Sequence, residues 1–320
     1  MEIKNVRKVS FWRIFFATLA ALLVASIISI IMFFSALGGV MGAFMSDKDL
    51  SSEVKDNTFL YLKLDKPVGD VGFSRINASN FSIDEQQGLG EIIYGLEKAK
   101  KDPKIKGIFI ETGAINSGYG NLFELREAIK DFEKSGKKVV FYAKGEAISL
   151  KALYLSTVTK DNYVFPESNV EFLGLSSELM FFKNTLDKLG VEVQVIRGEN
   201  NDFKSAVEPY FRTDMSDSSR LQVERFMNGI WNKLLTDISA DKGISVEKLN
   251  NFASNATILN GRDAAKNGLF SETKYRDEIL DLLKKYAGSE KDAPLYSLIN
   301  MLATNTIRKL KPKKVKMLLH

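Results

Sequence analysis

The chain has 320 residues, a net charge of +5 at pH 7, no cysteine and a single histidine, which is its last residue, His320. Without cysteine it has no thiol nucleophile, no thiolate metal ligand and no disulfide. With its one imidazole at an end that we expect to fray, it also lacks the residues for a Ser-His-Asp triad or an H-E-x-x-H metal site. Any catalysis therefore has to use Lys, Asp, Glu, Tyr, Ser or Thr.

Composition indicates an ordinary globular protein, with 45% hydrophobic and 27% charged residues and enough length for one large or two modest domains. Basic residues gather at the two ends. Residues 1–13 carry +3 and residues 308–316 carry +6, so the remainder carries −4. A basic nucleic-acid-binding body is therefore not indicated, and we expect no nucleic-acid partner.

An apolar run near the N-terminus predicts a transmembrane signal anchor. Residues 14–44 contain no charged side chain. This run is longer than the roughly 20 residues that a membrane helix needs. A cleaved signal peptide is the alternative, although its apolar region is usually about 7 to 15 residues. Basic residues precede the run and acidic ones follow it, which places residues 1–13 in the cytoplasm. A polar linker is expected at residues 45–57.

The next part of the chain alternates strand and helix patterns, so we predict an α/β fold in one domain, residues 58–287. Strand, crossover helix and strand recur over about 40 residues, which favours a parallel sheet. Residues 288–320 show no pattern that would bury them and are expected to be a linker or a ragged end. Strands are predicted at 58–64, 105–110, 138–142 and 191–196, and helices at 88–101, 121–135, 180–189, 218–239, 246–252 and 274–286.

Three segments resemble a known family. Residues 105–168 are similar to the core of the Clp protease and crotonase superfamily, and within it to the signal peptide peptidase A family, of protease IV type. Residues 201–220, NDFKSAVEPYFRTDMSDSSR, resemble the lysine segment of its long double-repeat form, and residues 259–270, LNGRDAAKNGLF, its closing helix. The resemblance implies a Clp protease/crotonase-like fold of repeated β-β-α units, with a strand at 163–166. The transmembrane helix predicted from the apolar run would precede this fold.

The resemblance also implies that Lys204 is the general base of a Ser-Lys dyad. A free lysine has a pKa of about 10.4 and is protonated at pH 7, but desolvation can lower that pKa by several units. The neutral amine can then take the proton of a serine without an imidazole. Around Lys204 the chain carries small or apolar residues, Phe203, Ala206 and Val207.

The nucleophilic serine is where the chain departs from the family pattern. Single-domain relatives carry it in a loop of the form A-S-G-G-Y, and Ser149 occupies the serine position here. Leu150 and Lys151 replace the two glycines. In the double-repeat form the serine belongs to the second repeat. We therefore interpret the chain as the first repeat, with the serine in a second repeat or another subunit, and Ser149 as an open alternative.

Two further clusters have both a functional and a structural interpretation. Residues 116–120, NSGYG, resemble the family's N-S-P-G-G turn, whose backbone N–H groups stabilise an oxyanion, but they also suit an ordinary turn before a helix. The carboxylates of Glu208, Asp214 and Asp217 could suggest a metal site. Their position before a long helix favours helix caps and first-turn acids instead.

The leading hypothesis is a membrane-anchored serine peptidase that degrades cleaved signal peptides and other hydrophobic peptides. It implies the bacterial inner membrane, with the bulk of the chain on the periplasmic side, a homo-oligomer, and no cofactor or metal. One alternative is a catalytically silent scaffold or oligomerisation half. Another is a crotonase-like acyl-CoA enzyme, which export disfavours because CoA thioesters are cytosolic.

Overall fold

The computed structural model describes residues 11–46, 54–77, 82–198, 201–288 and 294–297. The chain divides into two compact units, Met1–Ser52 and Glu53–His320.

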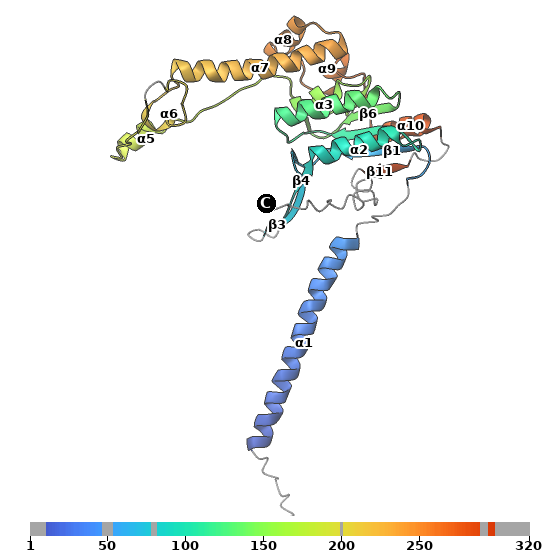
Figure 1. The fold of residues 1–320 in the computed structure, drawn as a ribbon, viewed down its shortest axis with the longest axis vertical. Coiled ribbons are helices and arrows are strands. Elements are labelled where there is room, and N and C mark those ends of the chain that lie inside the picture. Colours follow the sequence, from blue (N-terminus) through green and yellow to red (C-terminus); the bar gives the residue numbers. More distant parts are fainter. Residues whose placement is uncertain (1–10, 47–53, 78–81, 199–200, 289–293, 298–320) are drawn as a thin grey trace, which may run out of the picture. The chain divides into compact units, whose positions relative to one another are not determined.

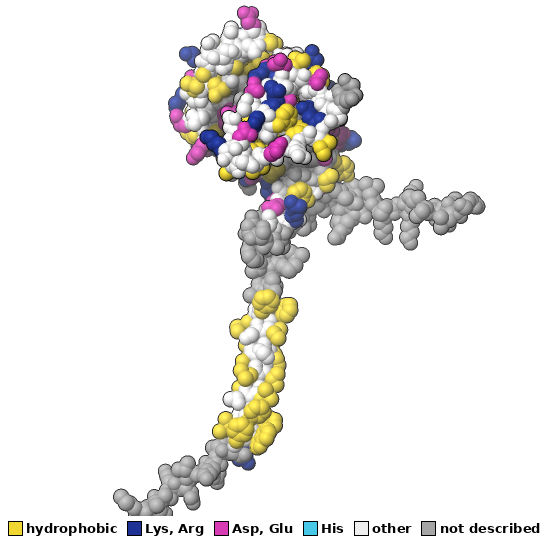
Figure 2. All heavy atoms as spheres, turned by 90° about the vertical axis from the view of Figure 1, so that its left-hand side faces the viewer, with side chains coloured by type: hydrophobic (Ala, Val, Ile, Leu, Met, Phe, Trp, Pro, Cys, Tyr) yellow, Lys and Arg dark blue, Asp and Glu magenta, His cyan; other side chains and the backbone are white. Residues whose placement is uncertain are grey.

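The first unit is one long helix, α1, Phe11–Ser46. Its stretch Phe11–Ser35 has a mean hydropathy of 2.7 and is long and apolar enough to cross a membrane. At 1.5 Å per residue, 25 residues extend for about 38 Å, more than the roughly 30 Å of a hydrocarbon core. Figure 2 shows mainly apolar side chains along the visible side of this stretch. The predicted apolar run is thus a single helix.

The second unit is built on a six-stranded sheet in which every pairing is parallel. Its strand order is β10-β8-β6-β5-β1-β11 (Figure 1). Three of these strands, β1, β5 and β6, are the ones that the apolar runs predict, and β8 overlaps the strand that the resemblance implies. The α/β class is confirmed. Their bounds are β1 Thr58–Lys63, β5 Ile105–Thr112, β6 Lys138–Ala143, β8 Asp161–Val164, β10 Glu272–Thr273 and β11 Leu295–Ser297.

Helices cover both faces of this sheet. Because side chains alternate along a strand, Leu60 and Ile108 belong to one core cluster, and Phe59 and Phe109 belong to the other. The first cluster takes in apolar side chains from α2, α3, α4, α7, α8 and α9, and the second those of α10. Each fully buried Leu or Phe stabilises the fold by roughly 1.5–3 kcal/mol. The bounds are α2 Leu89–Lys101, α3 Tyr119–Glu133, α4 Leu150–Ser156, α7 Asp217–Lys242, α8 Val246–Ser254, α9 Gly261–Lys266 and α10 Arg276–Ala287.

The edge strand β11 corrects one expectation. Residues 288–320 were predicted to be a linker or a ragged end, but Leu295 pairs with Phe59 of β1, and Tyr296 is buried. The backbone N–H of Phe59 also donates to Pro294 O at 2.9 Å. Three residues are too few to show a period, so no pattern could reveal this strand. Residues 298–320 lie outside the described residues.

Short strands that the sequence did not predict complete the unit. Between β1 and α2, strands β3 and β4 form an antiparallel hairpin, and β2 pairs in parallel with β4. Beyond β6, strands β7 and β9 pair with each other in parallel. The bounds are β2 Val68–Gly69, β3 Phe73–Asn77, β4 Ser82–Gly88, β7 Ala147–Ile148 and β9 Asn169–Val170.

A fully buried arginine joins three helices. Arg126 of α3 lies 4.2 Å from the ring of Tyr154 in α4 and donates hydrogen bonds to Tyr154 O and to Thr157 Oγ1. It also forms an ion pair with Asp241 in the last turn of α7. The hydroxyl of Tyr154 donates to Asp237 of α7 at 2.5 Å. These contacts fix the C-terminal end of α7 to the body of the unit.

The N-terminal half of α7 does not have the buried stripe that its spacing predicts. Leu234 and Leu235 are buried as expected, and Trp231 is half-buried. Leu221 and Phe226 are 41% and 69% exposed. The apolar residues therefore continue along α7 beyond the part of the helix that other described residues cover.

Candidate functional site

Ser149 and the turn at residues 116–120 meet at the carboxyl edge of the sheet. Strand β5 ends at Thr112 and β6 at Ala143, and the segments that follow them lead to the turn and to Ser149 respectively. In open α/β sheets, ligands bind outside this edge. The backbone N–H of Ser149 donates to Gly113 O at 2.9 Å, which ties the two segments together.

Glycine at position 113 makes this approach possible. A Cβ at Gly113 would lie 2.1 Å from Lys144 O, a separation that real Cβ atoms essentially never show. A side chain there would push the segment carrying Ser149 away from the end of β5. Gly113 is therefore a requirement of the site that the sequence analysis did not identify.

Ser149 is the N-cap of α4. Its half-buried Oγ accepts hydrogen bonds from the backbone N–H of Ala152 at 3.2 Å and of Ile115 at 3.4 Å. Both donors are backbone groups, and within the described part of the chain no lysine amine bonds to this oxygen. The local geometry therefore assigns Ser149 a capping role.

Lys151, one of the two residues in the glycine positions, fastens α4 to the turn. Its Nζ donates to Ser117 O at 2.6 Å and lies 4.8 Å from the centre of the Tyr119 ring. Burial lowers the pKa of Lys151 below its ordinary value. The sequence analysis noted Lys151 only as a departure from the family pattern.

The turn at 116–120 begins α3. Val68 N donates to Asn116 O at 2.8 Å, and Val68 forms a bridge with the buried Ser117. Gly118 is the N-cap, in an extended conformation, and α3 starts at Tyr119. The first backbone N–H groups of α3 thus follow a turn fixed by β2 on one side and by Lys151 on the other.

Lys204 lies on a different part of the unit, which we call the arm: residues 173–198 and 201–215. The arm includes α5, Lys183–Lys188, and α6, Glu208–Phe211. The Lys204 side chain is exposed. Its backbone N–H donates to Asn201 O at 2.9 Å and its carbonyl accepts from Arg197 Nη2 at 2.9 Å. The structure does not bring Lys204 to Ser149 within this chain.

The three acids near Lys204 form helix contacts. Buried Glu208 accepts from the N–H and the Oγ of Ser216, and Ser216 caps α7. Burial raises the pKa of Glu208, but the bonds from Ser216 outweigh it and hold the pKa below its ordinary value. Asp217 lies in the first turn of α7, and Asp214 pairs with Arg212. No group of three possible metal ligands occurs among the described residues.

The arm is held mainly by its own contacts and by the start of α7 (Figure 1). Phe182 N donates to Pro209 O at 2.7 Å, and the rings of Phe182 and Tyr210 stack at 6.1 Å. Between 173 and 198 no residue is buried. Ten large apolar side chains of the arm are more than a third exposed: Leu173, Leu179, Met180, Phe182, Leu189, Val191, Val193, Ile196, Phe203 and Tyr210.

Two predictions fail in the arm. The strand expected at 191–196 is not a strand, and the helix expected at 180–189 is limited to Lys183–Lys188. Val193 and Ile196 are 37% and 100% exposed. A strand needs a neighbouring strand to bond its backbone, and the described chain provides none here.

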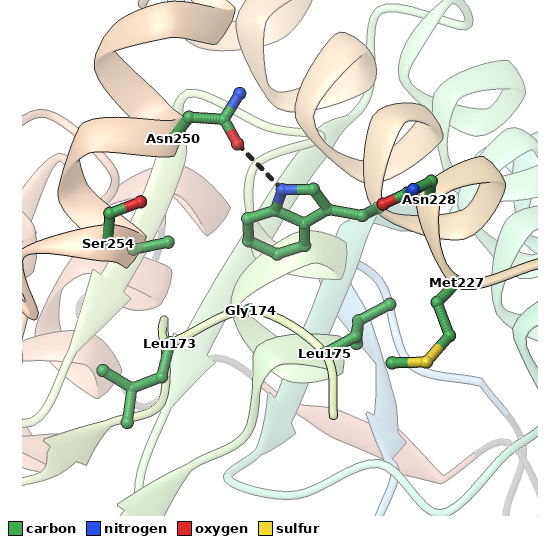
Figure 3. Close-up of a pocket in the computed structure, with 9 residues that line it drawn as sticks. Leu173, Gly174, Leu175, Met227, Asn228, Asn250 and Ser254 are labelled. Atoms are coloured by element: carbon green, nitrogen blue, oxygen red, sulfur yellow. Dashed lines mark hydrogen bonds between the residues drawn. The ribbon is translucent and has the colours of Figure 1, made fainter. Parts of the chain in front are cut away.

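A small pocket lies where the arm leaves the body, between residues 173–175, α7 and α8 (Figure 3). Its volume is 220 Å³. The indole N–H of Trp231 donates to Asn250 Oδ1 at 2.9 Å. None of its lining residues is charged: Leu173, Gly174, Leu175, Met227, Asn228, Trp231, Asn250, Ala253 and Ser254. The pocket therefore suits an uncharged group about as large as one side chain.

Comparison with known proteins identifies relatives. Residues 131–290 match the model of Peptidase family S49, which is half of the chain. The chain is 29% identical over 203 residues to Protease 4 of Haemophilus influenzae and 31% identical over 207 residues to Protease 4 of Salmonella typhi, covering 61% and 62% of this chain. It is 27% identical over 242 residues, 76% of this chain, to the chloroplastic serine protease SPPA of Arabidopsis thaliana.

The chain spans only about a third of these relatives: 32% of each Protease 4 and 34% of the Arabidopsis protein. Among solved structures it is similar to two of the 1510-N membrane-bound stomatin-specific protease, one of them with a substrate peptide. Identities are 11% and 12%, with TM-scores of 0.40 and 0.37. The matches cover 75% and 72% of this chain, and 97% and 80% of the solved chains.

Proposed function

The chain belongs to peptidase family S49, and from that premise we propose that it is the lysine-bearing repeat of a membrane-anchored Ser-Lys peptidase. Its substrates are cleaved signal peptides and other hydrophobic peptides. The observation that carries the proposal is the position of Lys204 on an arm whose apolar residues are left exposed by the described part of the chain.

Lys204 needs a drier environment to act as a general base. An exposed ammonium is protonated at neutral pH, whereas desolvation favours the neutral amine. Phe203 beside it is 56% exposed, so a second body that covers Phe203 also removes water from Lys204. In this proposal, the amine of Lys204 becomes neutral, and so able to act as a base, only when the second body binds.

The same second body supplies the nucleophile. Ser149 is tied by two backbone N–H groups at the sheet edge, and it does not meet Lys204 within this chain. The serine therefore comes from a second repeat or from a different kind of subunit, within an assembly that holds several copies of this chain. Residues 191–196 are not a strand in this chain, but their backbone can become one by pairing with a strand of that partner. Val191, Val193 and Val195 would then give the new strand one apolar face.

The anchor places this assembly near apolar substrates. Helix α1 is long and apolar enough to span a membrane, and basic residues precede it, which puts the second unit outside the cytoplasm. In a bacterium that is the periplasmic side of the inner membrane. Signal peptides remain in that membrane after cleavage, where an anchored enzyme meets them.

The turn at 116–120 lies beside Ser149 and not beside Lys204, so it serves as an oxyanion site only if Ser149 is the nucleophile. Its glycine-rich backbone leads into the N-terminus of α3, whose first N–H groups lack partners within the helix. The uncharged pocket beside Trp231 fits an apolar side chain of the substrate.

A catalytically silent scaffold is the second candidate, and the capping role of Ser149 favours it. The test compares the full chain alone with the native assembly from membranes of its source, both in detergent, on a labelled signal-peptide-like substrate. We expect cleavage by the assembly and little by the chain alone. Cleavage by the chain alone that Ser149→Ala abolishes would show a self-sufficient enzyme. If the assembly does not cleave the substrate either, the peptidase proposal is wrong and the scaffold function is the remaining candidate.

A further inference from the structure

A second cavity, of 580 Å³, lies at the carboxyl edge of the sheet beside the start of α10. Its volume is within the roughly 300–1,000 Å³ of ligand pockets. It includes neither Ser149, nor the turn at 116–120, nor any residue of the arm. Its lining residues are Tyr142, Lys144, Gly145, Glu146, Phe165, Glu167, Tyr275, Arg276 and Asp277.

Aromatic rings form the walls of this cavity. Phe165 follows β8 and meets Tyr275 edge to face, with ring centres 5.6 Å apart. Tyr142, at the end of β6, is buried, and its hydroxyl donates to Lys274 O at 3.2 Å. Tyr275 is 51% exposed, so its ring is open to a ligand. Such walls suit an aliphatic stem and, at a ring face, a cation.

Glu111, beneath the cavity, offsets one of the two positive charges of Lys144 and Arg276, and the carboxylates of Glu146 and Asp277 then bring the total to −1. Lys144 Nζ lies 2.7 Å and Arg276 Nε lies 2.8 Å from Glu111 Oε1, and Glu111 is fully buried. Tyr61 donates to the other carboxylate oxygen. Burial raises the pKa of Glu111, but the bonds from Arg276, Lys144 and Tyr61 outweigh it and keep the pKa below its ordinary value. Glu111 is therefore ionised at neutral pH.

Three carboxylates remain at the rim, all of them exposed: Glu146, Glu167 and Asp277. Glu167 pairs with Arg262. Glu146 and Asp277 have no ion pair within the part of the chain that the structure describes. Asp277, with Glu278, also offsets the positive N-terminal end of α10. A ligand that enters thus meets carboxylates that have no cation of their own.

We propose that this cavity binds a lysine or arginine side chain of a peptide. The aliphatic stem lies against Phe165 and Tyr275, and the charged end meets Glu146 and Asp277. The inference rests on the proposed function only in taking a peptide as the ligand. The chain would then hold a basic residue of the peptide at a site other than the bond to be cleaved. The peptide would be selected by its basic residue as well as by its apolar residues.

Peptide binding to the full chain in detergent tests this site without requiring cleavage. The probes are three labelled peptides with the same apolar sequence and one variable residue near the N-terminus: arginine, citrulline or glutamate. Fluorescence anisotropy gives each Kd. We expect the arginine peptide to bind about tenfold more tightly than the citrulline peptide. Equal affinities, or tighter binding of the glutamate peptide, would overturn the proposal.

The double variant Glu146→Gln/Asp277→Asn should remove the preference for arginine while leaving the citrulline peptide unaffected. Both residues are exposed, so folding should be retained, and the unfolding temperature checks it. Glu247→Gln is the matched control because Glu247 is also an acid in the first turn of a helix, α8, and does not line the cavity. A preference that survives the double variant places the site elsewhere. Binding selectivity with no peptidase activity in any assembly would leave this site standing and reject the proposed function.

Discussion

The Oγ of Ser149 accepts a hydrogen bond from the backbone N–H of Ala152 at 3.2 Å and so caps α4. Ser149→Ala should therefore lower the free energy of unfolding by about 1 kcal/mol. Because the proposal assigns the nucleophile to another repeat or subunit, the activity of the native assembly should be almost unchanged. Urea unfolding of the full chain in detergent and peptide hydrolysis by the assembly measure the two effects.

Ser245→Ala is the matched control, since Ser245 caps α8 through the same bond, to Lys248 N at 3.2 Å. The two variants should lose similar stability and keep similar activity. A loss of activity confined to Ser149→Ala would make Ser149 the nucleophile.

Substitutions of Lys204 test the general base. Lys204→Met should abolish hydrolysis by the assembly, and Lys204→Arg should do so too, because a guanidinium does not lose its proton in this pH range. Folding should be retained, since Lys204 is exposed in this chain. Lys188→Met, an exposed lysine of the same arm, is the control and should remain active. Normal turnover of Lys204→Met would mean that the resemblance at 201–220 is structural only.

The ion pair of Arg126 and Asp241 should contribute strongly to stability. Asp241→Asn leaves a fully buried guanidinium without its carboxylate, and we expect a loss of about 3 kcal/mol. Asp187→Asn removes the partner of an exposed i,i+4 pair, with Lys183, and should cost less than about 0.5 kcal/mol. Chemical unfolding of both variants compares them. Similar losses would show that burial does not decide the strength of this pair.

Glu111 should make the fold sensitive to acid. Its pKa in the folded chain is lower than the ordinary 4.5, so the folded state holds fewer protons than the unfolded state between the two values. The stability that Glu111 contributes is complete above pH 4.5 and is lost as pH falls through the lower, folded value.

Glu111→Gln should lower the free energy of unfolding by about 3 kcal/mol at pH 7 and flatten its decline below pH 4.5. Glu124→Gln, which changes an exposed carboxylate of α3, serves as control. An unchanged acid slope in Glu111→Gln would assign the sensitivity to other carboxylates.

The orientation of the anchor is testable with a reporter enzyme fused after residue 290. Basic residues precede α1, so we expect the reporter to lie outside the cytoplasm. A reporter that works only after export should therefore be active, and one that works only in the cytoplasm should be inactive. The control carries the same reporter on a chain that lacks residues 1–46. A fusion active in the cytoplasm would reverse the proposed topology.

Sequence patterns predicted the elements whose partners lie within this chain. Strands β1, β5 and β6 are apolar runs buried on both faces of a sheet, and helices α2, α3 and α10 have an apolar side that meets that sheet. In both cases the periodic side chains pack against residues of the same chain. The parallel sheet then followed from the need for crossover connections.

Patterns failed where the partner is missing or the signal is too short. Residues 191–196 have a strand pattern, yet a strand forms only when its backbone groups are paired. Phe226 continues the apolar stripe of α7 into a region that the described residues leave exposed. At the sheet edge, no pattern could show that Gly113 allows Ser149 to approach β5, because that contact joins residues 36 positions apart.

The uneven burial of α7 has a consequence for how a partner binds. Its last turns are anchored by Leu234, Leu235 and Asp241, while its first half has Ser219 as its only buried residue within the described chain. Hydrogen bonds along a poorly covered half open more easily than those in the core. One continuous helix thus has a durable end and a labile end. A partner that covers the labile end completes its ordering as it binds, so assembly and the final step of folding become a single event.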